Sequence, residues 1–201
     1  MARQARHFRT GGCYWIRAKS RPDLILFREP EDYAVYLTAL NYAKRRTHLK
    51  LYHYCLLRDE IHLVASISEP QTLSTTLHDA HLAFRWHHRK KYRTSGSLWH
   101  DRFHHATVKS DDLLTIGGEV ECLSVRAGLT THPADYPHSS YTTYALGQPN
   151  PYLDTNPLYI ALAPTAHHRQ ETYWKLATRI SLHLTQLPCP DITHGRASHV
   201  S

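Results

Sequence analysis

The chain has 201 residues, a formal net charge of +7 and 18 histidines. Its length suits one domain with an appendage, and its positive charge favours an anionic partner. No stretch approaches about 18 apolar residues and the basic N-terminus lacks an apolar segment, so the sequence predicts neither a membrane span nor a signal peptide. The four cysteines are far apart and form no C-x-x-C pair, which argues against a zinc ribbon or a disulfide scaffold and favours a cytoplasmic location.

Hydrophobic periodicity predicts three strands and two helices in the first half of the chain. The run Glu29-Pro30-Glu31-Asp32 is typical of a helix start, because proline and acids favour the first turn. The predicted elements are a strand over 13–19, a helix over 30–46, strands over 49–57 and 61–67, and a helix over 70–94.

The second half is predicted to contain a strand over 98–108, a helix over 110–128, a proline-rich wrap over 132–157 and a helix over 164–187. Gly117-Gly118 lower helix stability and mark an irregular position, and Gly128 is a suitable helix terminator. The first six elements follow the split β-α-β order of an α+β, ferredoxin-like fold. We therefore expect one domain over 1–130, a wrap and helix over 131–187 packed on it, and a disordered tail over 188–201.

Two polar residues begin the predicted strand over 61–67. Glu60 and His62 are two residues apart, so both side chains point to one face of the strand, opposite Leu63, Ala65 and Ile67. Such a pair is most often solvated. Glutamate and histidine are also ligands for divalent metals, so the pair is a candidate site for Mg²⁺ or Mn²⁺.

The densest basic run, residues 85–93, lies at the end of the second predicted helix. Cations there neutralise phosphates, and Trp86 and Tyr92 can stack on unpaired bases. The alternative is a solvated helix end, because cations are favoured at a helix C-terminus. Ser139-Ser140-Tyr141 either reaches a phosphate or forms a turn. The candidate DNA contacts are Arg85, Trp86, Arg89, Lys90, Lys91, Arg93, Arg102 and Arg126.

A series of short segments in consistent order covers roughly residues 10–177. They are Gly12-Cys13-Tyr14-Trp15, Tyr54-Cys55-Leu56-Leu57, Ser95-Gly96-Ser97-Leu98-Trp99-His100-Asp101-Arg102-Phe103, Val125-Arg126-Ala127-Gly128-Leu129, Ala134-Asp135-Tyr136-Pro137-His138-Ser139-Ser140-Tyr141 and Tyr152-Leu153-Asp154-Thr155. This ordered set resembles the REP-associated tyrosine transposases, a branch of the single-tyrosine HUH transposases. The resemblance implies the HUH transposase fold with extra C-terminal helices, and a single-stranded DNA hairpin as ligand.

The resemblance also implies a catalytic site, which this sequence retains only in part. In the family, two histidines hold a divalent metal, the following helix supplies a third ligand, and a tyrosine on that helix attacks phosphorus. Here the two histidine positions hold Glu60 and His62. Counted back from the V-R-A-G-L match, the nucleophile position holds Glu119 and the helical ligand position holds Leu123. A carboxylate is a legitimate metal ligand, but Glu119 cannot preserve tyrosyl transesterification.

The sequence leaves three hypotheses for the function. The first is a domesticated relative of these transposases, monomeric or homodimeric, that binds structured single-stranded DNA without forming a tyrosyl adduct. The second is a metal-dependent nuclease or transposase in which Glu60, His62 and Glu119 hold Mg²⁺ or Mn²⁺. The third is an RNA-binding or protein-binding module on the same fold. The fold alone cannot rank them, because function resides in the site.

Overall fold

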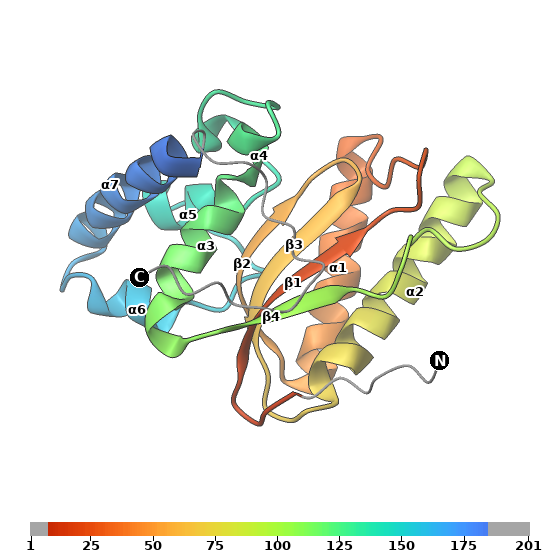
Figure 1. Cartoon of the computed structure of the whole chain (residues 1–201), viewed down its shortest axis with the longest axis horizontal. Coiled ribbons are helices and arrows are strands. Elements are labelled where there is room, and N and C mark those ends of the chain that lie inside the picture. The colour runs from red at the N-terminus through yellow and green to blue at the C-terminus, as the bar shows by residue number, and fades with distance from the viewer. Residues whose placement is uncertain (1–7, 185–201) are drawn as a thin grey trace.

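A four-stranded antiparallel sheet forms the centre of the molecule. The computed structural model describes residues 8–184, so the tail predicted over 188–201 lies outside them. The strand order is β2-β3-β1-β4, which with the intervening helices is the ferredoxin-like arrangement (Figure 1). The predicted α+β fold class is therefore confirmed. The strands are β1 (Cys13–Lys19), β2 (Lys50–Leu56), β3 (Glu60–Ser66) and β4 (His104–Val108).

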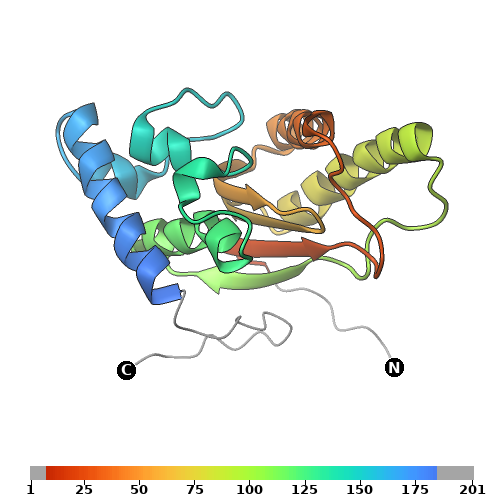
Figure 2. The same cartoon turned by 90° about the horizontal axis from the view of Figure 1, so that it is seen from above.

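Helices α1 (Pro30–Thr47) and α2 (Thr72–Tyr92) pack on each other and cover one face of the sheet (Figure 2). The acids that predicted the start of α1 form a capping box between Glu29 and Asp32. The apolar positions of both helices point at the sheet and form its larger core with residues such as Tyr14, Ile16, Leu63, Tyr36, Leu40, Leu77 and Phe84.

The remaining helices gather beside β2, where α3 (Leu113–Glu121) lies against β2 and β3. Two glycines permit this packing. A Cβ at Gly117 would overlap the imidazole of His53 on β2, and one at Gly118 would overlap Ile180. The glycine pair thus lowers the helix propensity of α3 but allows His53 and Ile180 to pack closely against two sides of the helix. The other helices here are α4 (Leu123–Arg126), α5 (Tyr141–Leu146), α6 (Pro157–Ala161) and α7 (Ala166–Leu184).

Three predicted elements differ from the structure. Strand β4 starts at His104 and not at 98, because the preceding residues form a loop that buries Leu98 and Phe103. The helix predicted over 110–128 is a 3₁₀ turn followed by α3 and α4, although Gly128 has the expected positive φ of 68°. The break places Val120 and Leu123 in one apolar cluster. The wrap over 132–157 contains α5 and leads into α6.

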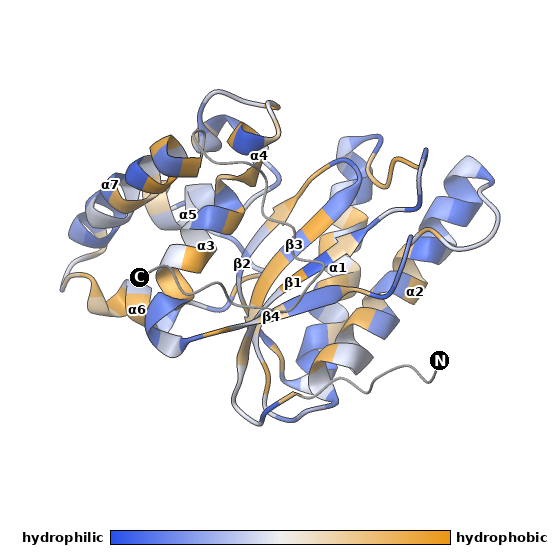
Figure 3. Ribbon diagram, in the orientation of Figure 1, coloured by the Kyte–Doolittle hydropathy of each residue, from blue (hydrophilic) through white to orange (hydrophobic). Residues whose placement is uncertain are grey.

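The surface character of α2 changes along its length. Figure 3 shows that the end of α2 that extends beyond the sheet is largely hydrophilic, and this end carries the predicted basic run. Among residues 8–184, no helix combines the length and apolar character needed to cross a membrane.

Candidate functional site

Glu60 and His62 lie on β3 and point to the same face of the sheet, with Glu60 Oε2 3.1 Å from His62 Nε2. Strand β1 places two cations beside them, because Arg17 is paired with His62 and Lys19 with Glu60 in the strand register. The Arg17 guanidinium donates two hydrogen bonds to the Glu60 carboxylate, at 2.9 and 2.7 Å. Lys19 Nζ lies 3.0 Å from the same carboxylate.

These contacts keep Glu60 charged. Burial raises the pKa of its carboxyl, but the hydrogen bonds from His62, Arg17 and Lys19 outweigh burial and hold the pKa well below its usual value. Both carboxylate oxygens are occupied, in the bidentate arrangement that a guanidinium favours. An arginine therefore neutralises Glu60 where a metal ligand was predicted.

His62 is engaged on both ring nitrogens. The Trp15 indole N–H donates to Nδ1 at 3.3 Å, so the proton of the neutral ring is assigned to Nε2, which donates to Glu60. Burial lowers the pKa of His62, which favours this neutral form. An imidazole with one nitrogen accepting and the other donating has no free lone pair for a metal ion.

The divalent metal that the family resemblance implies does not fit these side chains. Arg17 and Lys19 already neutralise Glu60, and His62 has no vacant nitrogen. Residues 8–184 contain no group of three or more His, Cys, Asp or Glu side chains that could hold a metal ion. Glu60, His62 and Glu119 are therefore not assembled into the cluster that the nuclease hypothesis requires.

Glu119, at the predicted nucleophile position, lies half-buried on α3. Burial raises the pKa of its carboxyl, and the neighbouring His183 and Arg126 side chains offset this only in part. Leu123, four residues on, belongs to α4, beyond the break at Cys122. The structure thus separates by a helix break the two positions that the resemblance places on one helix.

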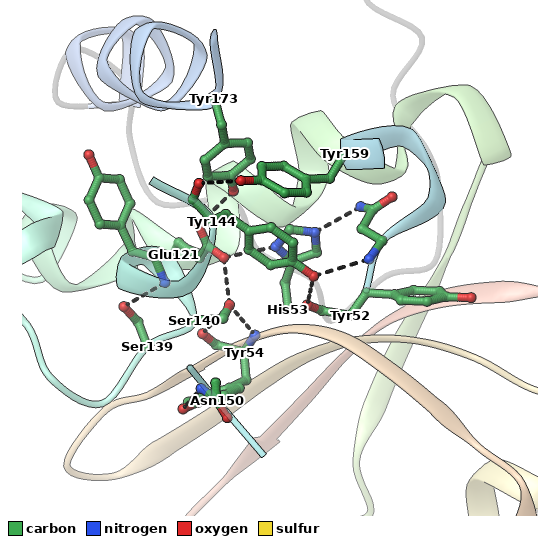
Figure 4. Close-up of polar contacts among 12 residues, drawn as sticks. Tyr52, His53, Tyr54, Glu121, Ser139, Ser140, Tyr144, Asn150, Tyr159 and Tyr173 are labelled. Atoms are coloured by element: carbon green, nitrogen blue, oxygen red, sulfur yellow. Dashed lines mark hydrogen bonds and ion pairs between the residues drawn. The ribbon is translucent and has the colours of Figure 1, made fainter. Parts of the chain in front are cut away.

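A further buried acid, Glu121 at the end of α3, was missed by the sequence reasoning. Its carboxyl is fully buried and accepts three hydrogen bonds (Figure 4). Ser140 Oγ donates at 2.5 Å, Tyr173 Oη at 2.6 Å and His53 Nδ1 at 2.8 Å. One signal was available, because acids two residues apart on a helix face different sides. Glu119 and Glu121 cannot both face solvent on a helix packed on the sheet.

The tautomer of His53 follows from its neighbours. Asn156 Oδ1 accepts the backbone N–H of Leu158, so the Asn156 amide nitrogen faces His53 Nε2 at 2.8 Å and donates to it. His53 Nδ1 therefore carries the proton donated to Glu121. This buried network joins β2, α3, α7 and the starts of α5 and α6. It is closed to solvent, so we assign it a structural role.

A different surface is open to solvent at the end of α2. Trp86 is 65% exposed, although tryptophan is usually buried. Four exposed cations lie next to it along the helix and the following turn. Three of them, Arg89, Lys90 and Arg93, line a groove of about 710 Å³ together with Trp86, Thr94 and Ser95. We call this set the basic-aromatic surface, and its members are Arg85, Trp86, Arg89, Lys90 and Arg93.

Lys91 does not belong to the basic-aromatic surface. Its ammonium group forms ion pairs with Glu29, Glu31 and Asp32 at the start of α1. Asp32 is fully buried and also accepts hydrogen bonds from His87 and Tyr92. These contacts fix the end of α2 to the start of α1. Lys91 thus takes part in structural ion pairs, and its predicted DNA contact stays a prediction.

Three further predicted contacts lie in different places. Arg102 is exposed in the loop before β4 and lines a groove beside α2. Arg126 lies in α4, which packs with α3 and α7 and not with the α2 surface. The Ser139-Ser140-Tyr141 run is buried, and the Ser140 hydroxyl donates a hydrogen bond to Glu121. The run therefore forms a structural turn and cannot reach a phosphate.

By its sheet order, the chain is an α+β protein of the ferredoxin-like class. No protein-family model matches the sequence, and no curated protein matches it. Among solved structures, it is similar to that of a REP-associated tyrosine transposase bound to a REP hairpin. The TM-score is 0.62 at 16% sequence identity, and the match covers 76% of this chain and 90% of that chain. At this identity the likeness shows the fold.

Proposed function

We propose that this protein binds structured single-stranded DNA through the basic-aromatic surface and forms no tyrosyl adduct. The observation that carries the proposal is the exposure of Trp86 among four cations that have no role in the core. Phosphate neutralisation and base stacking need these two side-chain types together.

The electrostatics of α2 favour a bound anion. The acids of α1 lie beside the end of α2, but Lys91, His87 and Tyr92 already bind them. These acids are therefore paired with other side chains and not with the exposed cations of the basic-aromatic surface. A phosphate backbone is the anion that matches a row of separated cations along one helix.

The fold neighbour supports the choice of ligand. That protein is bound to a REP hairpin, and the present chain matches 90% of its length. The absence of an adduct is proposed from the site, because Glu119 occupies the nucleophile register. The Glu60–Arg17 ion pair occupies the metal-ligand position. A guanidinium in that place also weakens the case for the metal-dependent nuclease.

The first test is fluorescence anisotropy with a labelled pool of single-stranded DNA hairpins at low salt. We expect Trp86→Ala to weaken binding by roughly 5- to 150-fold, because stacking on one base contributes about 1–3 kcal/mol. We expect Arg89→Ala to flatten the logarithmic salt dependence by about 0.7, the value for one phosphate contact on a single strand. The matched controls are Trp174→Ala and Arg179→Ala, which are exposed on α7 and should bind normally.

Three outcomes would point elsewhere. An equal loss of DNA affinity in the Trp86→Ala and Trp174→Ala variants would show that the basic-aromatic surface is not the binding site. Tighter binding of RNA hairpins of the same sequence would favour an RNA-binding module. A denaturing gel with Mn²⁺ separates the chemistries: cleaved DNA without an adduct indicates a nuclease, and a protease-sensitive shifted band indicates a surrogate nucleophile.

A further inference from the structure

The start of α1 places three acids beside the basic end of α2, and the Lys91 ammonium group meets all of them. Its nitrogen lies 2.5 Å from Glu31 Oε2, 2.9 Å from Glu29 Oε2 and 3.4 Å from Asp32 Oδ1. The two shorter contacts are with surface side chains, because Glu29 and Glu31 are 57% and 64% exposed. Lys91 is therefore held mainly by acids that water also reaches.

The buried acid does not depend on Lys91. His87 Nε2 lies 2.8 Å from Asp32 Oδ1, and Tyr92 Oη donates to Asp32 Oδ2 at 2.7 Å. Two backbone N–H groups at the start of α1 donate to Oδ2 as well, at 2.9 and 3.1 Å. These contacts engage both carboxylate oxygens, so Lys91 can move away without leaving a buried charge unpaired.

The ion pairs of Lys91 with Glu29 and Glu31 are of a kind that exchanges easily. Pairs between exposed side chains contribute little to stability, because water competes for both charges. A lysine ammonium is a compact charge on a flexible stem, and it accepts carboxylate or phosphate oxygens as partners. Lys91 follows Lys90 directly, so it borders the basic-aromatic surface. The two carboxylates thus occupy a cation at the border of the proposed phosphate-binding surface.

The acids also place negative charge beside that surface. The hydrogen bond and charge of Lys91 lower the pKa of Glu31, so this carboxyl is ionised at neutral pH. The three carboxylates at the start of α1 outnumber the two nearby cations, Lys91 and Arg28, which both lie over the ring of Tyr92. A phosphate within a Debye length, about 10 Å at 0.1 M salt, is repelled by this excess.

We infer that Glu29 and Glu31 compete within the chain for the cation that a phosphate needs: they hold Lys91 in the free protein and release it when DNA binds. The inference rests on the proposed function and adds regulation of the same surface. The competition lowers the affinity that charge alone gives to any nucleic acid. A ligand must therefore also make the stacking contact with Trp86 to bind tightly.

The test measures the affinity of a Glu29→Gln/Glu31→Gln double variant for the labelled hairpin pool, by fluorescence anisotropy over a range of salt concentrations. In the wild type, the freed carboxylates take up salt cations and cancel the counterions that Lys91 releases from the DNA. Without them, the logarithmic salt dependence should steepen by about 0.7–0.9, the value for one phosphate contact. Over the decade below 1 M salt, this slope corresponds to roughly 5- to 8-fold tighter binding at 0.1 M.

The matched control is Glu171→Gln on α7. Glu171 is also exposed and pairs with a lysine, because its carboxylate lies 2.7 Å from Lys175 Nζ. This variant should change neither the affinity nor the salt dependence. A gain as large as that of the double variant would overturn the inference, because it would come from net charge alone.

A Lys91→Met background separates release of Lys91 from simple loss of negative charge. There the two glutamine substitutions should give a smaller gain, because no ammonium group is left to release. Glu31→Gln alone keeps Glu29, the N-cap residue of α1, and should give part of the gain even if the double variant is less stable. An equal gain with and without Lys91 overturns the inference.

NMR follows the ammonium group directly. The ¹⁵Nζ signals of Lys91 and Lys175 can be assigned with Lys91→Arg and Lys175→Arg variants. Saturating the protein with the hairpin pool should shift the Lys91 signal and leave that of Lys175, which is paired on α7. An unchanged Lys91 signal would show that the ion pairs persist in the complex and would overturn the inference.

The outcomes separate the two proposals. Binding by the wild type, with no gain in either glutamine variant, overturns the competition and leaves the proposed function intact. Failure of the wild type and of the double variant to bind any hairpin at low salt overturns the proposed function, and this inference with it.

Discussion

Two glutamates two residues apart on α3 should respond in opposite ways to the same substitution. Glu121→Gln changes a fully buried carboxyl that accepts hydrogen bonds from His53, Ser140 and Tyr173. Glutamine has one amide oxygen, which can replace Oε1 and keep two of these bonds. Its NH₂ group then faces the Tyr173 hydroxyl, so one buried donor loses its acceptor.

The magnitude follows from these contacts. An unsatisfied buried donor costs about 1–3 kcal/mol, and the two remaining bonds each lose roughly 1 kcal/mol when the acceptor loses its charge. We therefore expect Glu121→Gln to lower the free energy of unfolding by about 3–5 kcal/mol. For a chain of this size that corresponds to a fall in Tm of roughly 6–20 °C.

Glu119→Gln is the matched control. Burial raises the pKa of Glu119, so the folded protein disfavours its charged form at neutral pH. Removing that charge should leave stability unchanged or slightly increased. The gain should be present above the raised pKa and vanish as pH falls through it, because the wild-type carboxyl is then protonated as well.

Urea unfolding followed by circular dichroism measures both variants. A Tyr173→Phe substitution adds a double-mutant cycle, in which its cost should be smaller in the Glu121→Gln background than in the wild type. Equal stability of the two glutamine variants, or a Tyr173→Phe cost that is the same in both backgrounds, would refute the assignment of Glu121 as the centre of the buried network.

Three other predictions concern the rest of the scaffold. Mn²⁺ or Mg²⁺ should leave Tm unchanged, whereas an ion bound at about 100 times its Kd would add roughly 2.7 kcal/mol to the free energy of unfolding. A clear rise in Tm that Glu60→Gln abolishes would show that the ion displaces Arg17 from Glu60. Asp32→Asn should cost about 3–5 kcal/mol at neutral pH, because it breaks a buried ion-pair network. Burial raises the pKa of Asp32, but its hydrogen bonds outweigh burial and hold the pKa below its usual value. The stability that the charged carboxylate contributes is therefore lost as pH falls through this lowered pKa, and urea unfolding at acid pH should show wild type and variant converging. A difference that stays constant with pH would contradict this. Gly117→Ala should lower Tm although alanine favours helices, because its methyl group overlaps His53; a raised Tm would mean that α3 packs less closely.

The fold could be predicted from the sequence because its elements depend on local patterns. The start of α1 follows from proline and acids, and the hairpin of β2 and β3 from alternation around a turn. The start of β4 could not be placed, because Leu98 and Phe103 are apolar residues that resemble strand positions. They are buried in the core but belong to the loop that precedes β4. The break at Cys122 depends on how α3 and α4 share one apolar cluster, which is a tertiary constraint.

The candidate site was predicted only in part, for a similar reason. Period-two alternation correctly placed Glu60 and His62 on one face, because it is a local rule. It could not show that Arg17 occupies the neighbouring strand, since strand pairing joins residues far apart in the chain. The same limit applies to Lys91, whose partners lie in α1, and to Glu121, whose partners come from β2, α5 and α7.

Glu60 and Arg17 are physically linked. A glutamate on this half-buried face needs a cation, and Arg17 supplies one with two hydrogen bonds. A histidine at residue 60 would leave the Arg17 guanidinium without its acceptor and next to two imidazoles. Both a metal ion and the guanidinium would then compete for the same space. Metal binding at this face would therefore require change at residues 17 and 60 together. The Glu121 network and the α2 surface use neither of these positions, nor residue 119.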